Sequence, residues 1–249
     1  MSKKVIKLLT IIAFVLFLSA LAFYLVKYFE AKKDANGLKI NTTALEIMVA
    51  DVDGNLYHTV KIGTQVWLKE NLKVEHYNDG SPIANVTDNT AWANFTTGAY
   101  CYYNNDTGFK DTYGALYNWY AVGTKKLAPA GWHVASDEEW TTLKAFLGNA
   151  RNDELDISGG KLKEAGTVHW NSPNYGATNS SGFTALPGGD RESITGLFSN
   201  MTKSGYFWSS TACFGEEAWG KHLSWNYINL SNDASYSQEA GFSVRCVKD

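Results

Sequence analysis

Residues 131–140 read Gly-Trp-His-Val-Ala-Ser-Asp-Glu-Glu-Trp, and this stretch decides the fold class. Ser136 and Glu139 form a capping box, in which the serine side chain bonds the Glu139 amide and the glutamate side chain bonds the Ser136 amide. Apolar residues follow at helical spacing, namely Trp140, Leu143, Phe146 and Leu147. We therefore expect a helix that begins after Ser136, ends near Gly148 and packs one apolar face on the core.

Short strands are expected on both sides of this helix. Upstream, a turn pair at Asp53-Gly54 precedes β-rich residues at 56–62, and a second turn pair at Gly63-Thr64 separates these from a returning run at 65–68, which is typical of a β-meander. Downstream, strand-like runs occupy 206–211, 218–223, 227–230 and 242–247. A second helix is expected over 113–121, capped by Asp111 or Thr112, and the Gly- and Asn-rich stretch 159–204 is expected to be a long structured loop region. The pattern predicts an α+β domain.

An uncharged apolar stretch precedes this domain. Residues 8–26 contain no charged side chain, and as a helix they would span about 28 Å, which matches a bilayer core. Lys3, Lys4 and Lys7 come before it, so the positive-inside bias favours an exported C-terminal domain. We expect an anchor over 1–30, a tether over 31–50 and one domain over 51–249. A signal peptide cleaved after Ala22 is the alternative, and it would give a secreted protein.

The charge distribution argues against a nucleic-acid partner. The chain has 22 basic and 25 acidic residues, and residues 38–249 alone carry a net charge of −7, with 16 basic and 23 acidic side chains. Nucleic-acid binding needs a basic surface that neutralises phosphates. We therefore expect no nucleic-acid ligand for the exported domain.

The sequence contains no recognisable catalytic or metal-binding motif. The five histidines are scattered singly, at 58, 76, 133, 169 and 222, and the nucleophile-elbow, Cys-x-x-Cys and His-Glu-x-x-His motifs are absent. Asp51, Asp53 and Asn55 imitate the start of a calcium loop, but Ile62 stands where the closing glutamate is needed. We expect no metal, no cofactor and no catalysis. An enzyme would require titratable groups to converge, for example His133, His169, Asp190, Arg191 and Glu192.

Several motifs carry a resemblance to a known family. The stretches DVDGNLYHTVKIGTQVWLKENL (51–72), YGALYNWYAV (113–122), GWHVASDEEW (131–140), GGKLKEAG (159–166), YFWSST (206–211) and GFSVRCVKD (241–249) occur in this order. They resemble the Fibrobacter succinogenes major paralogous domain, a family of exported bacterial modules. Two of the stretches are similar to segments of the formylglycine-generating group, and the resemblance implies a C-type-lectin-like fold whose last strands return beside the first.

The resemblance also bears on the cysteines. An odd set of three, Cys101, Cys213 and Cys246, permits at most one intramolecular bridge. Cys101 and Cys246 both lie in family motifs, so the resemblance implies a disulfide bond between them. Three reduced thiols are the alternative. The redox cysteine pair of the formylglycine-generating relatives has no counterpart here, and that activity is not carried over.

Aromatic and amide side chains gather near the C-terminus, where the resemblance places ligand-facing loops. Rings supply contact area at low entropy cost and amides supply directed hydrogen bonds, which suits sugar or peptide recognition. The candidate ligand-binding residues are Glu216, Glu217, Trp219, Trp225, Asn226 and Tyr227. We expect a membrane-anchored envelope module, held by residues 8–26, that binds a glycan or a protein. A structural or adhesive role with protein partners only, and an enzyme with an unrecognised site, are the alternatives.

Overall fold

A computed structural model gives the structure of the chain and describes residues 48–148, 156–231 and 234–249. These residues belong to one compact unit, Glu46–Asp249. The expected membrane segment at 8–26, and most of the expected tether, lie outside the described residues. Among the residues that are described, none of the helices has the length and apolar content needed to span a bilayer.

Most of the described regular structure is β-sheet. A two-stranded sheet joins β1 and β2, a four-stranded sheet has the order β3-β4-β14-β8, a three-stranded sheet has the order β5-β6-β7, and a five-stranded sheet has the order β10-β9-β11-β12-β13. The strands are β1 (Val49–Ala50), β2 (Leu56–Tyr57), β3 (Thr59–Ile62), β4 (Gln65–Leu68), β5 (Ala84–Asn85), β6 (Ala99–Cys101), β7 (Leu116–Tyr117), β8 (Trp132–Val134), β9 (Gly188–Arg191), β10 (Phe198–Met201), β11 (Ser204–Ala212), β12 (Glu217–Ser224), β13 (Ala234–Ser237) and β14 (Cys246–Lys248).

The helices of the described residues are short, and among them only α5 exceeds two turns. They are α2 (Asn89–Ala93), α3 (Lys110–Tyr113), α4 (Trp119–Gly123), α5 (Asp137–Leu147) and α6 (Ser158–Leu162). Two single 3₁₀ turns, Tyr103–Asn105 and Thr107–Phe109, precede α3. The domain is therefore α+β with strands predominating, as expected from the sequence.

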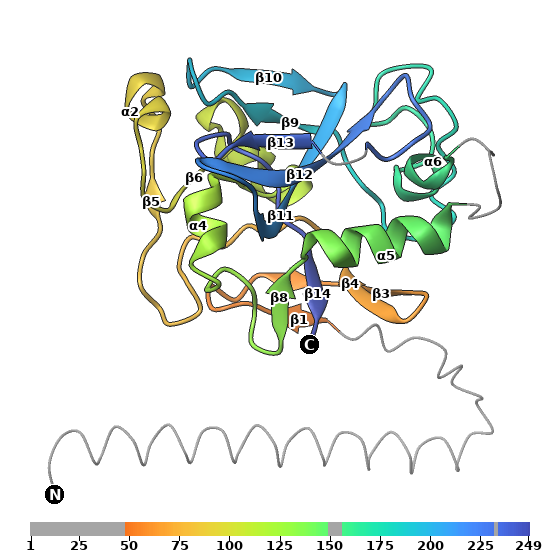
Figure 1. Cartoon of the computed structure of the whole chain (residues 1–249), viewed down its shortest axis with the longest axis horizontal. Helices are drawn as coiled ribbons and strands as arrows, with labels where there is room; N and C mark the ends of the chain where they lie inside the picture. The colour runs from red at the N-terminus through yellow and green to blue at the C-terminus, as the bar shows by residue number, and fades with distance from the viewer. Residues whose placement is uncertain (1–47, 149–155, 232–233) are drawn as a thin grey trace, which may run out of the picture. The chain divides into compact units, whose positions relative to one another are not determined.

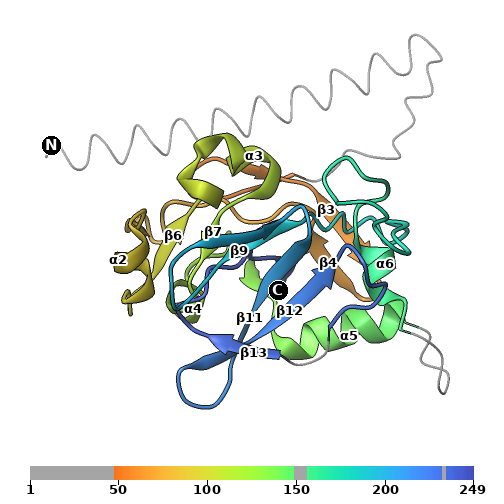
Figure 2. The ribbon, with the colours of Figure 1, turned by 90° about the horizontal axis from the view of Figure 1, so that it is seen from above.

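The five-stranded sheet lies between the two largest groups of buried apolar side chains. Along β11, Trp208 joins one group with Phe242 and Val244, whereas Phe207 joins the other with Trp140 of α5. This follows from the alternation of side chains along a strand. Figures 1 and 2 both show α5 alongside β12, and the four-stranded sheet that contains β14 lies on the other side of α5 in Figure 1. The domain is thus built around β11 and β12.

The capping box and its helix are confirmed. Ser136 caps α5, its hydroxyl accepts a hydrogen bond from the Glu139 amide, and the Glu139 carboxylate accepts one from the Ser136 amide. Trp140, Leu143 and Leu147 are buried as expected. Phe146 is the exception, because its side chain is 62% exposed and covers Gly63 at the surface.

The prediction of one helix over 113–121 is wrong, because the chain turns sharply at Gly114. This residue has a φ of +74°, and a Cβ there would lie 2.7 Å from the Leu72 carbonyl oxygen. The chain then forms β7, and α4 starts only after Asn118, whose side chain accepts a hydrogen bond from the Ala121 amide. Packing of residue 114 against Leu72 thus divides one helical pattern into a short helix, a strand and a second short helix.

The downstream strands are confirmed in part. The runs at 206–211 and 218–223 fall within β11 and β12. Residues 227–230 form no strand, and within 242–247 only the last two residues belong to one, β14. β14 lies between β4 and β8, so the end of the chain does return beside the first strands. The 159–204 region contains α6 and the β9–β10 hairpin in addition to loops.

The start of the domain is a turn held by a carboxylate. Asp51 Oδ1 accepts hydrogen bonds from the amides of Asp53 and Asn55, each at 2.9 Å, and its Oδ2 accepts one from the Tyr57 hydroxyl at 2.6 Å. The oxygens of Asp51 are therefore engaged within the turn. This agrees with the interpretation as a hairpin turn instead of a calcium loop.

The expected disulfide bond is contradicted. Cys101, Cys213 and Cys246 are all free thiols. Cys101 lies in β6 of the three-stranded sheet and Cys246 in β14 of the four-stranded sheet, and they belong to different groups of buried side chains. Burial raises the pKa of the Cys101 thiol to about 12 and raises that of Cys246 as well. Both cysteines therefore act as buried apolar residues.

Candidate functional site

The structure separates the sequence-predicted ligand residues into two groups. Glu216, Glu217 and Trp219 lie where the β11–β12 turn enters β12, whereas Trp225, Asn226 and Tyr227 follow the other end of that strand. β12 has eight residues, and at about 3.3 Å per residue its two ends are roughly 23 Å apart. One small ligand cannot contact both groups.

The acidic group shows no sign of a metal site. Glu217 accepts a hydrogen bond from the Ser235 hydroxyl at 2.5 Å, and both glutamates are exposed. Within residues 48–148, 156–231 and 234–249, no cluster of histidine, cysteine, aspartate or glutamate is arranged to hold a metal ion. The second group is the more informative one.

A cavity of about 190 Å³ lies at this second end of β12. Its lining residues are His222, Ser224, Tyr227, Asn229 and Ser231. Tyr227 is 61% exposed, so most of its ring is free to contact a ligand. Asn229 is also exposed, and it adds an amide to the cavity. We call this the Tyr227 cavity.

The segment that carries Tyr227 rests on a buried lysine. Lys163 is fully buried, and its ammonium donates hydrogen bonds to the carbonyl oxygens of Tyr175, Ser224 and Tyr227 at 3.0, 2.8 and 2.8 Å. Burial lowers the pKa of Lys163 to about 8, so at neutral pH the ammonium retains the three protons that these three carbonyls accept. The segment that follows β12 is therefore fixed at the Tyr227 backbone by the buried Lys163 ammonium.

Two glycines of α6 allow the same segment to approach closely. A Cβ on Gly159 would lie 2.4 Å from the Asn229 carbonyl oxygen, and one on Gly160 would lie 2.9 Å from Ile228 Cγ1. The Gly160 amide donates a hydrogen bond to the Ile228 carbonyl at 2.6 Å. This hydrogen bond engages the Ile228 carbonyl with α6 instead of with a neighbouring strand. The Gly-Gly-Lys-Leu-Lys motif is thus the support of the Tyr227 cavity, a role that the sequence did not reveal.

His222 forms the polar base of the cavity. Its ring stacks on Tyr206 with the centroids 4.5 Å apart, and its Nε2 lies 3.0 Å from the Ser204 hydroxyl oxygen. Burial lowers the pKa of this imidazole, which favours the neutral ring at neutral pH. The lining then consists of a neutral imidazole, hydroxyls, an amide and a phenol, and it contains no formal charge.

The two tryptophans contribute less to this cavity than the sequence indicated. Trp225 is half-buried and packs against the group of buried side chains around Trp67 and Trp140. Trp219 is half-buried in β12 and is paired with Ser235 of β13. The Ser224 hydroxyl donates to the Asn226 side-chain oxygen at 2.5 Å, which holds Asn226 beside the cavity. Tyr227 is therefore the main exposed ring.

A buried carboxylate lies near Tyr206 on the neighbouring strand. Asp190 of β9 accepts hydrogen bonds from the Ser199 hydroxyl at 3.1 Å and the Asn200 amide at 2.8 Å. Burial raises the pKa of Asp190, and burial together with the Asp190 charge raises the pKa of Tyr206. In the sequence, Asp190 stands out only as a member of a hypothetical catalytic cluster.

The members of that hypothetical cluster lie in separate local networks. The His133 ring is hydrogen-bonded to Asp249 and Glu139. The His169 ring is hydrogen-bonded to Glu164, and the Glu192 carboxylate accepts a hydrogen bond from the Thr195 hydroxyl. Arg191 is fully buried between the Trp92 and Phe198 rings and donates to the carbonyls of residues 86, 87 and 196. The structure does not bring these five residues together.

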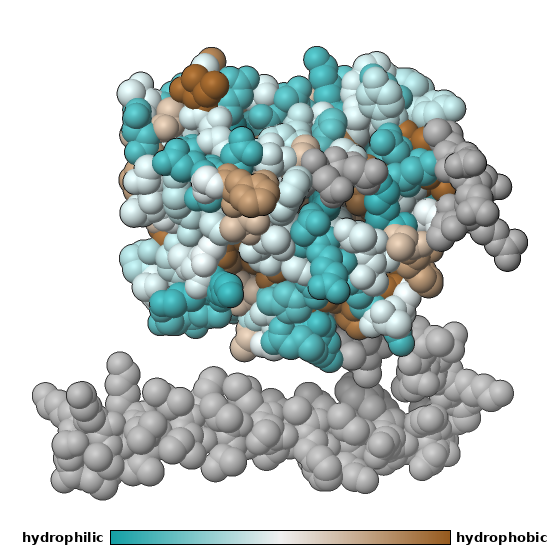
Figure 3. All heavy atoms as spheres, viewed as in Figure 1, coloured by the Kyte–Doolittle hydropathy of each residue, from teal (hydrophilic) through white to brown (hydrophobic). Residues whose placement is uncertain are grey.

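The visible surface in Figure 3 is mainly hydrophilic, and its hydrophobic residues form separate patches. Isolated exposed apolar residues are normal for a soluble surface. On this face the described domain therefore presents no broad apolar area, and small cavities are the features that could select a ligand.

Comparison with known proteins gives one result. The family model described as Fibrobacter succinogenes major domain matches residues 60–248. No curated protein and no solved structure gives a significant match. The matched range contains both α5 and the whole of the Tyr227 cavity.

Proposed function

The chain belongs to the Fibrobacter succinogenes major domain family, and from that premise we propose that it is a non-catalytic binding module of the cell envelope that recognises a glycan. The observation that carries the proposal is the Tyr227 cavity, in which an exposed ring borders a small space lined by uncharged side chains that carry hydrogen-bonding groups. Sugars are bound by aromatic faces that cover their C–H groups and by neutral groups that bond their hydroxyls.

The size and charge of the cavity define the ligand further. Its volume of about 190 Å³ is below the roughly 300–1,000 Å³ of sites for drug-sized ligands, so a single terminal sugar suits it better than a long chain segment. An acidic sugar or a phosphate would need a cation among the lining residues, and the lining supplies none. The proposed ligand is therefore a neutral sugar unit of an envelope or host glycan.

A glycan array tests the proposal with the full-length protein and two variants. Tyr227→Ala and Asn229→Ala remove exposed side chains and should leave the fold intact. We expect each to weaken binding of neutral glycans by tenfold or more, because stacking and an amide hydrogen bond are lost. Leu197→Ala, at another exposed apolar residue, is the control and should bind normally. Absence of glycan binding by the wild type would refute the proposal.

We propose a C-type-lectin-like arrangement for the domain. The support is the order of the elements, with an early hairpin, α5, a long irregular region and a last strand that lies between β4 and β8. An experimentally determined structure compared with known C-type-lectin-like domains tests this. A different strand order in the four-stranded sheet would rule it out.

We propose that the domain is exported and held at the membrane by residues 8–26. The support is the uncharged apolar sequence and the lysines before it. Proteolysis of intact cells or spheroplasts should remove the domain and leave the N-terminal segment in the membrane fraction. Recovery of soluble protein that begins after Ala22 would favour the secreted alternative.

A protein-binding role is the second candidate, and one observation favours it. Phe214 lies in the turn between β11 and β12 and is 92% exposed, as expected of a ring that inserts into a partner. Crosslinking in cells separates the two roles, because a purely structural component would give stable protein partners that Phe214→Ser abolishes and Tyr227→Ala leaves unchanged.

A further inference from the structure

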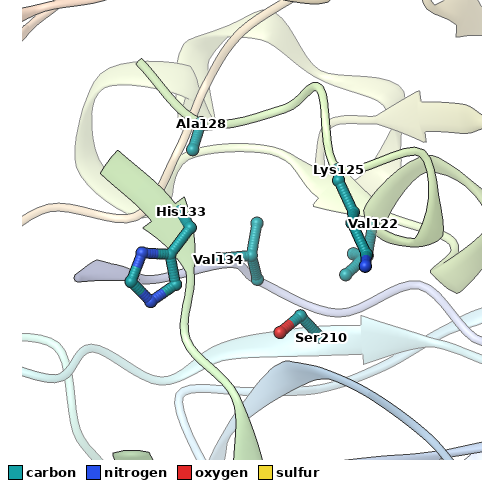
Figure 4. A pocket seen from close by; sticks show the side chains of 6 residues that line it. All are labelled: Val122, Lys125, Ala128, His133, Val134 and Ser210. Carbon is teal, nitrogen blue, oxygen red and sulfur yellow. The ribbon is translucent and has the colours of Figure 1, made fainter. Parts of the chain in front are cut away.

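A second cavity lies between α4, β8 and β11, away from the residues that line the Tyr227 cavity. Its volume is about 240 Å³, and its lining residues are Val122, Lys125, Ala128, His133, Val134 and Ser210. In Figure 4, Lys125 and His133 lie on opposite sides of the group, with Val134 and Ser210 between them. Three of the six residues are aliphatic, and most of the accessible lining surface is apolar.

His133 offers no nitrogen to a ligand. Its Nδ1 lies 2.6 Å from Asp249 Oδ1 and its Nε2 lies 2.7 Å from Glu139 Oε1. Both ring nitrogens are therefore used within the protein, and the ring serves as a wall. His133 is thus paired with two carboxylates within the protein, and Lys125 supplies the cation among the lining residues.

The polar groups left for a ligand are those of Lys125 and Ser210. Within the described part of the chain, the Lys125 ammonium has no ion pair or hydrogen bond, and neither does the Ser210 hydroxyl. Their backbones are fixed, because the Lys125 amide donates to the Val122 carbonyl at 3.0 Å and the Ser210 amide to the Ala135 carbonyl at 2.9 Å. The lining thus offers a cation and a hydroxyl donor beside its aliphatic side chains.

The backbone at Lys125 is unusual for a lysine. Its φ is +59°, in the left-handed region that costs a residue with a Cβ about 1–2 kcal/mol. Glycine would adopt the same turn without this cost. The turn therefore keeps a long cationic side chain at the cavity although the backbone alone would favour glycine.

We propose that this cavity binds a small carboxylic acid with an apolar body, such as a short branched or aromatic acid. The apolar body would contact Val122, Ala128 and Val134, and the carboxylate would meet the Lys125 ammonium and accept a hydrogen bond from Ser210. A phosphate is a poorer match, since one ammonium and one hydroxyl leave most of its charge unpaired in an apolar setting. A purely apolar ligand would leave the cation unused.

Titration of the full-length protein with benzoate and 3-methylbutanoate, followed by ligand-observed NMR, tests the proposal. Benzamide is the neutral probe of the same shape. The wild type should bind the acids saturably and bind benzamide about fivefold more weakly, which is the effect expected of one ion pair at a cavity rim. In Lys125→Met the acid and the amide should bind equally. This variant keeps a Cβ at position 125, so it adds no backbone strain.

Lys126→Met is the matched control. Lys126 carries the same charge one residue further along, but it pairs with Asp79 at 2.8 Å and does not line the cavity. The control should bind the acids as the wild type does, and Ser210→Ala should weaken acid binding more than amide binding. Three results would overturn the proposal: no saturable acid binding, equal binding of benzamide and benzoate to the wild type, or equal losses in Lys125→Met and Lys126→Met.

Discussion

Lys163 illustrates how single residues determine the shape of the proposed site. A buried ammonium is costly unless hydrogen bonds compensate for its lost hydration, and Lys163 meets this requirement with three backbone carbonyls. The same bonds fix the segment that carries Tyr227. The sequence showed the motif around Lys163, but it could not show which carbonyls the ammonium would meet, because they come from residues 12 to 64 positions away.

Lys163→Met should lower the free energy of unfolding by about 2–4 kcal/mol, since several buried carbonyls lose their donor. Urea denaturation at pH 7 measures this. Lys203→Met is the control. Lys203 is exposed, so its substitution should change the free energy of unfolding by no more than about 0.5 kcal/mol. Equal stability of the two variants would show that Lys163 does not support the loop.

His133 gives a pH dependence whose direction can be worked out. Burial lowers its pKa, but the hydrogen bonds to Asp249 and Glu139 raise it by more, and the net result is a raised pKa. The stabilising contribution is therefore fully present below pH 6.5, the ordinary value of histidine, and is lost as the pH rises through the folded-state pKa. The melting temperature of wild type should exceed that of His133→Gln by more at pH 5.5 than at pH 9. An equal difference at both pH values would contradict the assignment.

Helices and strands were predicted well where the sequence signal is local, and poorly where contacts between residues distant in sequence determine the backbone conformation. The capping box of α5 lies within four residues, and its helix was predicted correctly. The pattern over 113–121 looked equally helical, but contact between Gly114 and residues 71–72 interrupts it. Phe146 fits the apolar spacing of α5, yet Leu143 and Leu147 are buried in the core and the Phe146 ring lies against Gly63 at the surface.

Gly114→Ala tests why the 113–121 pattern divides. Gly114 and Gly131 both have positive φ values, +74° and +79°, but only at Gly114 would a Cβ collide with backbone. Gly131→Ala should therefore show the conformational strain alone, about 1 kcal/mol, and Gly114→Ala should cost at least 2 kcal/mol more in urea denaturation. If both substitutions cost the same, the close approach of Leu72 does not determine the break.

At the scale of the whole molecule, the family, the α+β class and the return of the last strand could be predicted because the motifs extend over nearly the whole domain. The disulfide bond between Cys101 and Cys246 was predicted wrongly, because shared membership of family motifs gives no distance between two residues. Glu216, Glu217 and Trp219 were grouped with Trp225, Asn226 and Tyr227 for the same reason. Nearness in sequence hid the length of β12, which separates the two groups.

The free thiols lead to a test on the intact domain. Cys101 and Cys246 are fully buried, whereas Cys213 is half-buried near the β11–β12 turn. Iodoacetamide at pH 8 should modify only Cys213 in the native protein and all three cysteines after denaturation without reductant, as read by mass spectrometry. Recovery of two peptides linked through Cys101 and Cys246 would show that the disulfide bond forms and would contradict the free thiols.

The central claim is that a neutral glycan binds at the Tyr227 cavity. Chemical-shift mapping of the isotope-labelled protein, titrated with the strongest neutral glycan from the array, tests the place of binding directly. The largest shifts should occur in the amides of residues 222–231, and residues 213–217 at the other end of β12 should remain unchanged. Shifts centred on residues 213–217, or unchanged shifts in wild-type residues 222–231 at saturating glycan, would contradict the claim.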